Sequence, residues 1–153
     1  MADCSDSVQK RGTSNPIQSK IVENDHGSGG SSTGDNTISG ATCDASVAVG
    51  NVVRMNGGTA VNALADSLTN SRIIGICVSK ASATECDIQV TGFTDTGVLS
   101  GLSINTDYFL SETTPGAITT TPPSGSGNTV TFIGRAYATN QLVINIGIPL
   151  IRA

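Results

Sequence analysis

The sequence predicts an all-β fold, built as a sandwich or small barrel. Thr, Ser, Val, Ile and Asn are abundant, and β-branched side chains suit a pleated sheet better than a helix. Charged residues make up only 13% of the chain and aromatic residues 3%, while glycine occurs 18 times. Short apolar runs alternate with turn signals along most of the chain. Together these three observations favour many short strands joined by tight turns.

The first part of the chain, residues 1–42, has a different composition. Its few apolar positions include Ile17, Ile21 and Val22, and its centre, residues 26–36, is rich in Gly and Ser. Such a segment buries too little apolar area to offset its ordering entropy, about 1–2 kcal/mol per residue. We therefore expect residues 1–42 to be an extended arm that a partner surface orders, with these three residues as anchors.

Residues 43–153 have the pattern expected of a β core. Turn chemistry separates the apolar runs, as in Asn56-Gly57-Gly58 and Thr114-Pro115-Gly116. One helical turn over 63–68, where Leu64 and Leu68 are four residues apart, is as plausible as a loop. The predicted strands are 46–55, 59–64, 72–80, 84–92, 107–111, 117–120, 129–138 and 141–148.

The segment 72–91 carries the most informative pattern. Its run from Ile73 to Val78 is apolar on both faces, so this strand is either central in the fold or covered by another subunit. A hairpin turning about 81–82 would place Cys77 opposite Cys86, within bridging distance of a disulfide. Synthesis in a cytoplasm favours free, buried thiols instead, and both alternatives stay open.

The C-terminal strand is apolar along one side through Leu142, and the chain continues apolar to residue 151. An exposed apolar end is a liability that burial against a neighbouring copy removes. We therefore expect this end and the doubly apolar strand to form an oligomer interface. Its candidate residues are Ile73, Ile74, Ile76, Val78, Ile144, Ile146, Ile148, Leu150 and Ile151.

Metal and cofactor chemistry is not indicated by the sequence. The four cysteines, Cys4, Cys43, Cys77 and Cys86, form no C-x-x-C pair, and His26, in the Gly/Ser segment, is the only histidine. A zinc site needs closely spaced thiolates or imidazoles. Residues 27–30 lack the lysine of a P-loop, and no calcium-loop ligand series is present. We expect no cofactor.

Catalysis, nucleic-acid binding and membrane insertion are also not indicated. A positioned nucleophile–histidine pair is improbable with one histidine in the arm, and no feature selects a pair of carboxylates. The net charge is −4 and no basic cluster occurs. The apolar run 142–151 is too short for a membrane helix, and the N-terminus has no apolar signal-peptide core.

Several short segments, taken in order, resemble structural proteins of tailed-phage virions, namely capsid cement proteins and the stem or collar modules of head and tail fibres. Asn51 stands where the commoner form of the first segment has Asp. The resemblance covers about 110 residues, leaves residues 1–42 uncovered, and implies a compact β-barrel or β-tulip-like module that is often trimeric. The segments are Val49-Gly50-Asn51-Val52-Val53, Ala65-Asp66-Ser67, Ile73-Ile74-Gly75, Gly101-Leu102, Tyr108-Phe109-Leu110-Ser111 and Ile118-Thr119-Thr120-Thr121-Pro122-Pro123.

The function expected on this basis is that of a non-enzymatic capsid decoration protein, made in a bacterial cytoplasm and bridging major capsid subunits as a homotrimer. A fibre, collar or adaptor component that contacts connector or tail proteins is the alternative. A surface carbohydrate-binding module is a third, disfavoured because sugar sites commonly stack on aromatic rings. Most of the five aromatic residues (Phe93, Tyr108, Phe109, Phe132 and Tyr137) are expected in the core.

Overall fold

The computed structural model describes residues 36–153, and this part of the chain contains only β-strands and the loops between them. The all-β prediction is thereby confirmed. The predicted arm anchors Ile17, Ile21 and Val22 lie outside the described residues. Within residues 36–153 there is no helix long and apolar enough to cross a membrane.

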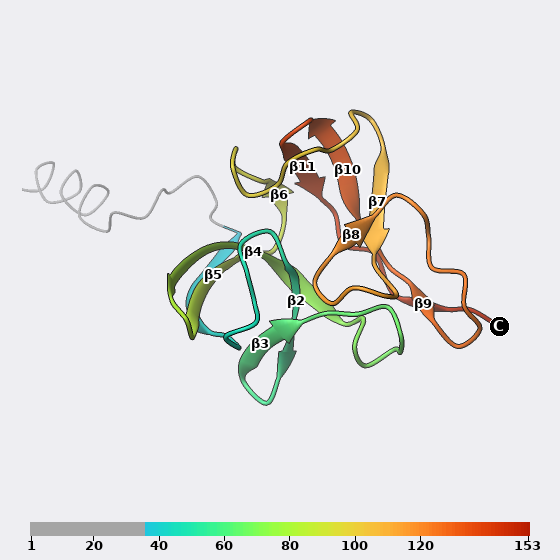
Figure 1. The fold of residues 1–153 in the computed structure, drawn as a ribbon, viewed down its shortest axis with the longest axis horizontal. Helices are drawn as coiled ribbons and strands as arrows, with labels where there is room; N and C mark the ends of the chain where they lie inside the picture. Colours follow the sequence, from blue (N-terminus) through green and yellow to red (C-terminus); the bar gives the residue numbers. More distant parts are fainter. Residues whose placement is uncertain (1–35) are drawn as a thin grey trace, which may run out of the picture. The chain divides into compact units, whose positions relative to one another are not determined.

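The strands form two five-stranded antiparallel sheets and one two-stranded sheet (Figure 1). The first sheet has the order β1-β5-β4-β2-β3, with β1 Thr37–Thr42, β5 Glu85–Gln89, β4 Ile73–Ser82, β2 Val52–Asn56 and β3 Thr59–Asn62. The second has the order β6-β11-β10-β7-β8, with β6 Gly92–Phe93, β11 Gln141–Ile144, β10 Phe132–Ala138, β7 Asp107–Leu110 and β8 Ile118–Thr119. The third pairs β12 Leu150–Ile151 with β9 Thr129–Val130.

The first sheet is strongly curled, so that its two outer strands approach each other (Figure 1). Cys43, directly after β1, forms an isolated bridge with Ala60 of β3, and the Asp44 amide donates to the Ala60 carbonyl at 2.8 Å. Buried side chains fill the inside of this curl, which we call the curl core. Its residues are Cys43, Val47, Val53, Ala60, Cys77, Cys86 and Ile88.

A second core lies between the two five-stranded sheets. The first sheet contributes Val52 and Ile76, and the second contributes large side chains such as Leu110 and Ile133. We call this the inter-sheet core. The described residues therefore form two packed sheets, an arrangement compatible with the predicted sandwich; neither sheet closes into a barrel. Its residues are Val52, Ala63, Ala65, Ile76, Leu102, Tyr108, Leu110, Ile133, Ala136, Leu142 and Ile144.

The two cores explain why the run from Ile73 to Val78 is apolar on both faces. Successive side chains of a strand point to opposite sides of the sheet. Ile76 of β4 therefore lies in the inter-sheet core, and its neighbour Cys77 lies in the curl core. The strand is central within the fold, which was the first of the two alternatives predicted.

Several predicted boundaries are wrong. Residues 37–42, predicted to belong to the arm, form β1 and pair with β5, and the compact unit begins at Asn36. Residues 46–51 are a loop rather than the start of a strand, and the predicted strand 129–138 is interrupted at Thr131. The short strands β6 and β12 were not predicted, because two residues carry no periodicity.

Residues 63–68, for which a helical turn and a loop were equally plausible, form a loop. Ala63 and Ala65 are both fully buried in the inter-sheet core, whereas Leu68 is exposed. Alternation of buried and exposed positions is typical of extended chain rather than helix. The predicted turn at Thr114-Pro115-Gly116 is present, and Gly116 has a φ of +75° that glycine adopts without strain.

Candidate interaction surfaces

The nine predicted interface residues do not share one surface. Ile76 and Ile144 are 0% and 1% exposed in the inter-sheet core, so they cannot contact a neighbouring copy. That part of the prediction is wrong, because a pattern apolar on both faces does not say which apolar residues the chain covers itself. Ile73 and Ile146 pack against the inter-sheet core and Ile74 against the curl core, each partly buried. Val78 of β4 is also partly buried.

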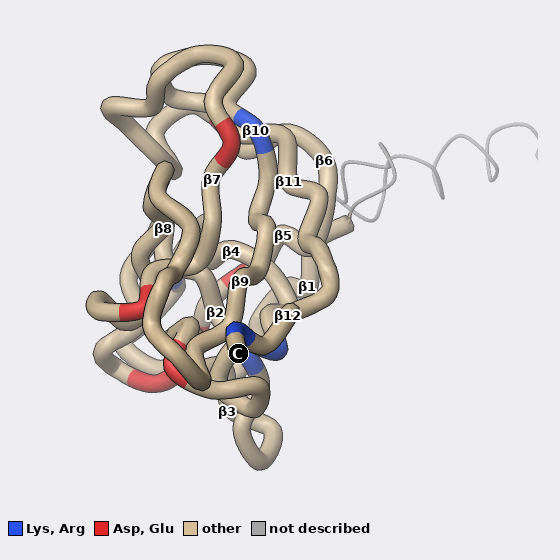
Figure 2. The backbone as a smooth tube through the Cα atoms, turned by 90° about the vertical axis from the view of Figure 1, so that its right-hand side faces the viewer, with Lys and Arg blue, Asp and Glu red and all other residues tan. Residues whose placement is uncertain are grey.

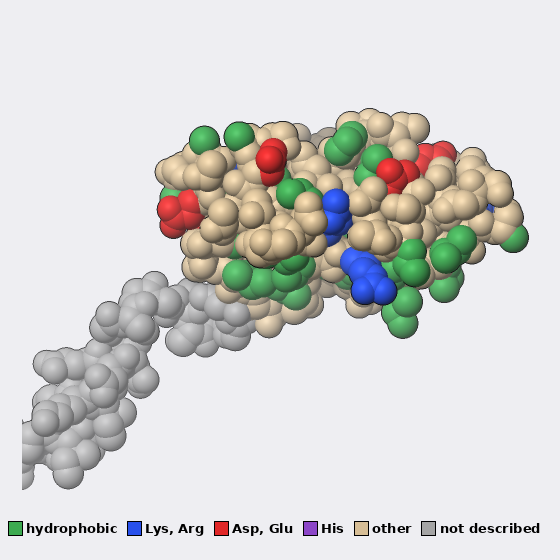
Figure 3. Space-filling view, turned by 90° about the horizontal axis from the view of Figure 1, so that it is seen from below, with side chains coloured by type: hydrophobic (Ala, Val, Ile, Leu, Met, Phe, Trp, Pro, Cys, Tyr) green, Lys and Arg blue, Asp and Glu red, His purple; other side chains and the backbone are tan. Residues whose placement is uncertain are grey.

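Three of the predicted residues are well exposed and lie together at the chain end: Ile148 is 84% exposed, Leu150 66% and Ile151 62%. We call these three the C-terminal strip. Leu150 and Ile151 are adjacent in β12, so their side chains point to opposite faces of this two-stranded ribbon. Hydrophobic side chains are visible at this end of the molecule in Figure 3.

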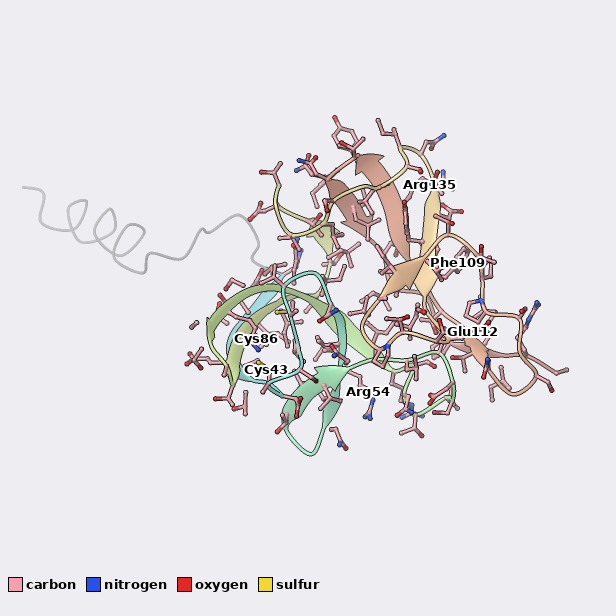
Figure 4. All side chains as sticks on the ribbon, in the orientation of Figure 1. Cys43, Arg54, Cys86, Phe109, Glu112 and Arg135 are labelled. Atoms are coloured by element: carbon pink, nitrogen blue, oxygen red, sulfur yellow. The ribbon has the colours of Figure 1, made fainter. Side chains whose placement is uncertain are left out.

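The C-terminal strip is held in place by one carboxylate acting through a loop. Glu112 Oε2 accepts hydrogen bonds from Asn128 Nδ2 at 2.7 Å and from the amides of Ser124 and Gly125 at 3.1 and 3.2 Å. The same loop binds the chain end, because the Gly127 amide donates to the Arg152 carbonyl and the Arg152 amide to Asn128. Figure 4 labels Glu112 beside this loop.

The hydrogen bond from Asn128, followed by that from the Gly125 amide, lowers the pKa of Glu112. The carboxylate is thus kept ionised as an acceptor that gathers three donors. It fixes the loop geometry on which the position of β12 depends.

The aromatic side chains lie mainly on the outer face of the second sheet, and their predicted place in the core is wrong. Only Tyr108 is buried, at 6% exposure. Phe93 and Tyr137 are 57% and 65% exposed and pack edge to face, with ring centroids 5.6 Å apart. Phe109 and Phe132 form a second such pair at 5.9 Å. Four of the five aromatic residues therefore lie outside the two cores.

A shallow hollow opens beside the Phe93–Tyr137 pair. It has a volume of ≈ 500 Å³, and we call it the Tyr137 pocket. The loop before β7 forms one wall, held by a hydrogen bond from the Asn105 amide to the Ala136 carbonyl at 2.8 Å. Ile104, on this loop, is 61% exposed. The lining residues are Ile104, Asn105, Arg135, Ala136, Tyr137 and Val143.

One ion pair, the only one among residues 36–153, borders this pocket. Arg135 Nε of β10 lies 2.6 Å from Asp107 Oδ1 of β7, and the two side chains are 58% and 41% exposed. Figure 2 shows a positive and a negative position side by side on these two strands. The hydrogen bond from Arg135 lowers the pKa of Asp107. The pair leaves the pocket rim without net charge.

The three cysteines of the described range, Cys43, Cys77 and Cys86, are free thiols buried together in the curl core. Figure 4 shows Cys43 and Cys86 inside the curl of the first sheet. Burial raises the pKa of Cys77 and of Cys86, and neighbouring thiols raise that of Cys86 further. The thiols are therefore small apolar core groups rather than nucleophiles.

The predicted register that placed Cys77 opposite Cys86 is wrong. Cys77 pairs with Ile88, and Cys86 pairs with Lys80. The reason is that the hairpin turns at 83–84, after the Ser82–Glu85 pair, and two bulges shift the register on the way. A count of residues about an assumed turn cannot anticipate bulges.

The carboxylates of the described range serve loops and strand ends. Ser46 donates to Asp44, and Ser79 and the Gly40 amide donate to Asp87, which lowers the pKa of both carboxylates. Within residues 36–153, no group of three or more His, Cys, Asp and Glu side chains is placed to hold a metal ion. These singly placed acids resemble turn caps rather than an acid–base pair.

Comparison with known proteins gives no relative: no family model, no curated protein and no solved structure matches the chain.

Sequence reasoning missed the Tyr137 pocket, although one signal was present. In Gly134-Arg135-Ala136-Tyr137 the positions alternate, so that Gly134 and Ala136 are buried while Arg135 and Tyr137 are exposed. A charged residue two positions before Tyr137 predicts that both face solvent. The contribution of Ile104, from a loop thirty residues earlier, has no local signal.

Proposed function

We propose that this chain is a non-enzymatic structural protein of a tailed-phage virion, acting as a capsid decoration protein on the major capsid protein. The observation that carries the proposal is the C-terminal strip. Ile148, Leu150 and Ile151 are each more than 60% exposed at the end of the module and lie outside its two buried cores. Grouped exposed aliphatic residues mark a surface that another protein covers.

The order of short segments resembling phage structural proteins supports the same assignment. Of these, Val49–Val53 enters β2, Ile73–Gly75 begins β4 and Tyr108–Ser111 contains most of β7. They contribute Val52, Val53, Tyr108 and Leu110 to the two cores. The resemblance therefore rests on positions that build the fold, and the partner surface is proposed from the exposed residues.

A fibre, collar or adaptor component at a vertex or tail is the closest alternative. In that role the chain would use the same exposed surfaces to contact connector or tail proteins. Copy number separates the two roles, since a decoration protein covers the capsid and an adaptor occupies one vertex. Quantification of the chain against the major capsid protein in purified particles distinguishes them.

Carbohydrate binding is a second candidate function that one observation favours. Exposed aromatic rings beside hydrogen-bonding side chains are suited to sugar rings, and Phe93 and Tyr137 lie beside Arg135 and Asn105. Because the few aromatic residues lie mainly outside the cores, the low aromatic content weighs less against carbohydrate binding.

The experiment that tests the decoration role is add-back to particles made without the protein. Purified full-length chain is mixed with such particles, which are then sedimented. We expect the chain to sediment with the particles, and the variant Leu150→Asp to stay in the supernatant. Full-length chain that remains in the supernatant would reject the proposal. Met55→Asp, at an exposed apolar position of β2, is the matched control.

A further inference from the structure

The two five-stranded sheets are built on the same plan. Counted along the chain, the strand order in each sheet is first, fifth, fourth, second, third, since β1-β5-β4-β2-β3 and β6-β11-β10-β7-β8 follow one scheme (Figure 1). In both sheets the second strand pairs with the third and the fourth with the fifth, always antiparallel. Among residues 36–153, β9 is the only strand inserted into the second copy of the scheme. The described chain therefore contains two structural repeats, residues 36–90 and 92–144.

The register of the strands supports this correspondence residue by residue. The second and fourth strands of each repeat are opposed through three matching pairs of residues. In both repeats one bulge lies between the second and the third of these pairs. The pairs are Val52 with Ile76, Val53 with Gly75 and Arg54 with Ile73 in the first repeat, and Asp107 with Arg135, Tyr108 with Gly134 and Phe109 with Phe132 in the second. Each residue of one strand pair thus has a counterpart in the other repeat.

The loop before the second strand is also the same in the two repeats. The Gly50 amide donates to the Cys77 carbonyl at 2.7 Å, and the Asn105 amide donates to the Ala136 carbonyl at 2.8 Å. The Cys77 and Ala136 amides return a hydrogen bond to the residue that follows Gly50 or Asn105, at 2.9 and 3.0 Å. Gly50 and Asn105 both have a positive φ, of +90° and +60°. Asn105 therefore occupies a position for which the first repeat uses glycine.

The outer face of the second repeat differs from its counterpart in the first. One row of opposed residues crosses four strands in each sheet: Thr37, Gln89, Ile76 and Val52 in the first, and Phe93, Val143, Arg135 and Asp107 in the second. Val52 and Ile76 are 0% exposed in the inter-sheet core. Their counterparts, Asp107 and Arg135, form the exposed ion pair. The first repeat builds this backbone with aliphatic residues at these two positions, so the fold does not require a charged pair there.

Asn105 separates the two faces further. In the first repeat the chain itself covers the loop, because a Cβ atom on Gly50 would lie 2.7 Å from the Val98 carbonyl oxygen. Asn105 carries a Cβ atom, so no backbone can approach it in the same way. Asn105 instead lines the Tyr137 pocket together with Ile104. The outer face of the second repeat is thus suited to contacts between side chains and a ligand rather than to the packing of another repeat.

The side chains of this face suit an uncharged saccharide. Tyr137 and Phe93 are 65% and 57% exposed, and their rings can pack against the apolar side of a sugar ring. Arg135 Nε donates to Asp107 Oδ1, which leaves the terminal guanidinium nitrogens and Asp107 Oδ2 able to bind sugar hydroxyl groups. Single-stranded nucleic acid also stacks on aromatic rings, but it requires cations that no carboxylate neutralises. The pairing of Arg135 with Asp107 therefore favours a neutral ligand.

We propose that the outer face of the second repeat is a binding site for a neutral saccharide. Tyr137 and Phe93 pack against the sugar rings, and Arg135, Asp107 and Asn105 bind hydroxyl groups. This inference rests on carbohydrate binding as the second candidate function and names its site. The site includes no residue of the C-terminal strip, so a capsid partner and a saccharide would contact separate surfaces.

Binding of the full-length chain to an array of neutral oligosaccharides, followed by titration calorimetry with the oligosaccharide that gives the strongest signal, tests the site. Tyr137→Ala and Phe93→Ala should each weaken binding by about tenfold, because each removes a stacked ring. Tyr137→Phe keeps the ring and should bind within about threefold of wild type. Met55→Ala, at an exposed apolar position of the first sheet, is the matched control and should bind like wild type. Since both aromatic side chains are more than half exposed, their variants should keep the wild-type urea midpoint.

Three results would overturn the inference. The first is that no neutral oligosaccharide binds. The second is saccharide binding that Tyr137→Ala and Phe93→Ala leave unchanged, which would reject this site and leave carbohydrate binding to another surface. The third is binding of a thymidine oligonucleotide in place of any saccharide, lost on addition of salt and in Tyr137→Ala, which would assign the face to single-stranded nucleic acid.

These outcomes are independent of the virion role. A chain that sediments with particles but binds no oligosaccharide would reject the saccharide site and leave the decoration role standing. A chain that binds an oligosaccharide through Tyr137 but is absent from particles would support the site and reject the decoration role.

Discussion

Val52 and Val53 are neighbours in β2, yet they belong to two different cores: Val52 lies between the two five-stranded sheets and Val53 lies inside the curl of the first sheet. Both are 0% exposed. The centre of the first sheet is thus buried on both faces by a single chain, and β2 and β4 contribute to both cores at once.

Removing volume from either core should therefore destabilise the whole domain. Ile76→Ala in the inter-sheet core and Ile88→Ala in the curl core should each lower the free energy of unfolding by about 2–5 kcal/mol. Both should do so in one cooperative urea transition. Val49→Ala, at a position that is 44% exposed, should change the free energy of unfolding by less than about 0.5 kcal/mol. A separate early transition in Ile88→Ala would show that the curl core folds independently.

Truncation should show where the folded unit begins. Residues 36–153 should fold, because β1 then still covers the edge of β5. Residues 43–153 should be much less stable, because without β1 the edge of β5 has no paired strand and the curl core loses its contact with Ala41. Urea unfolding of the two truncated chains measures the difference. Equal midpoints would mean that β1 contributes nothing to the first sheet.

Glu112 should make stability depend on pH. Its hydrogen bonds lower its pKa from the ordinary value of 4.5, so its contribution is present above that value and lost as the pH falls through the lower folded pKa. Glu112→Gln should therefore be less stable than wild type at neutral pH, and the difference should shrink in acid. Unfolding curves across this pH range measure both proteins. A difference that is constant with pH would exclude the carboxylate as the cause.

The buried thiols should be protected from modification in the folded protein. Because burial raises the pKa of Cys77 and Cys86, an alkylating reagent at mildly alkaline pH should label them only at the rate of unfolding. Labelling followed by peptide mass spectrometry, with and without urea, gives the rates. Fast labelling of Cys86 without urea would show that this thiol is accessible in the folded protein. A peptide mass that corresponds to a Cys77–Cys86 disulfide would show that the two thiols are not free.

The all-β class and most central strands could be predicted from the sequence because they depend on local alternation. The run from Ile73 to Val78 could be recognised as a strand that is apolar on both faces. Whether this strand is central in the fold or covered by another subunit could be decided only once the curl of the first sheet was known. The Cys77–Cys86 pairing failed because bulges are invisible in a sequence. β1 was missed because Ser39, Gly40 and Thr42 are exposed edge positions with no apolar pattern.

The surface residues show the same difference between what a local sequence pattern predicts and what depends on distant parts of the chain. Ile148, Leu150 and Ile151 were predicted to be at an interface because the chain end is uniformly apolar, and they are exposed. Ile76 and Ile144 have the same local pattern but are covered by distant parts of the chain. The Tyr137 pocket joins Ile104 to β10 and β11, a long-range contact that no local pattern encodes.

The function that we propose requires this chain to be a component of a virion. The most direct measurement is quantitative mass spectrometry of gradient-purified particles, with the major capsid protein as the internal reference. We expect the chain to be present in a fixed ratio to the capsid protein, unchanged through successive gradients. Detection of the chain only in the soluble lysate fraction, with none in the particles, would contradict it.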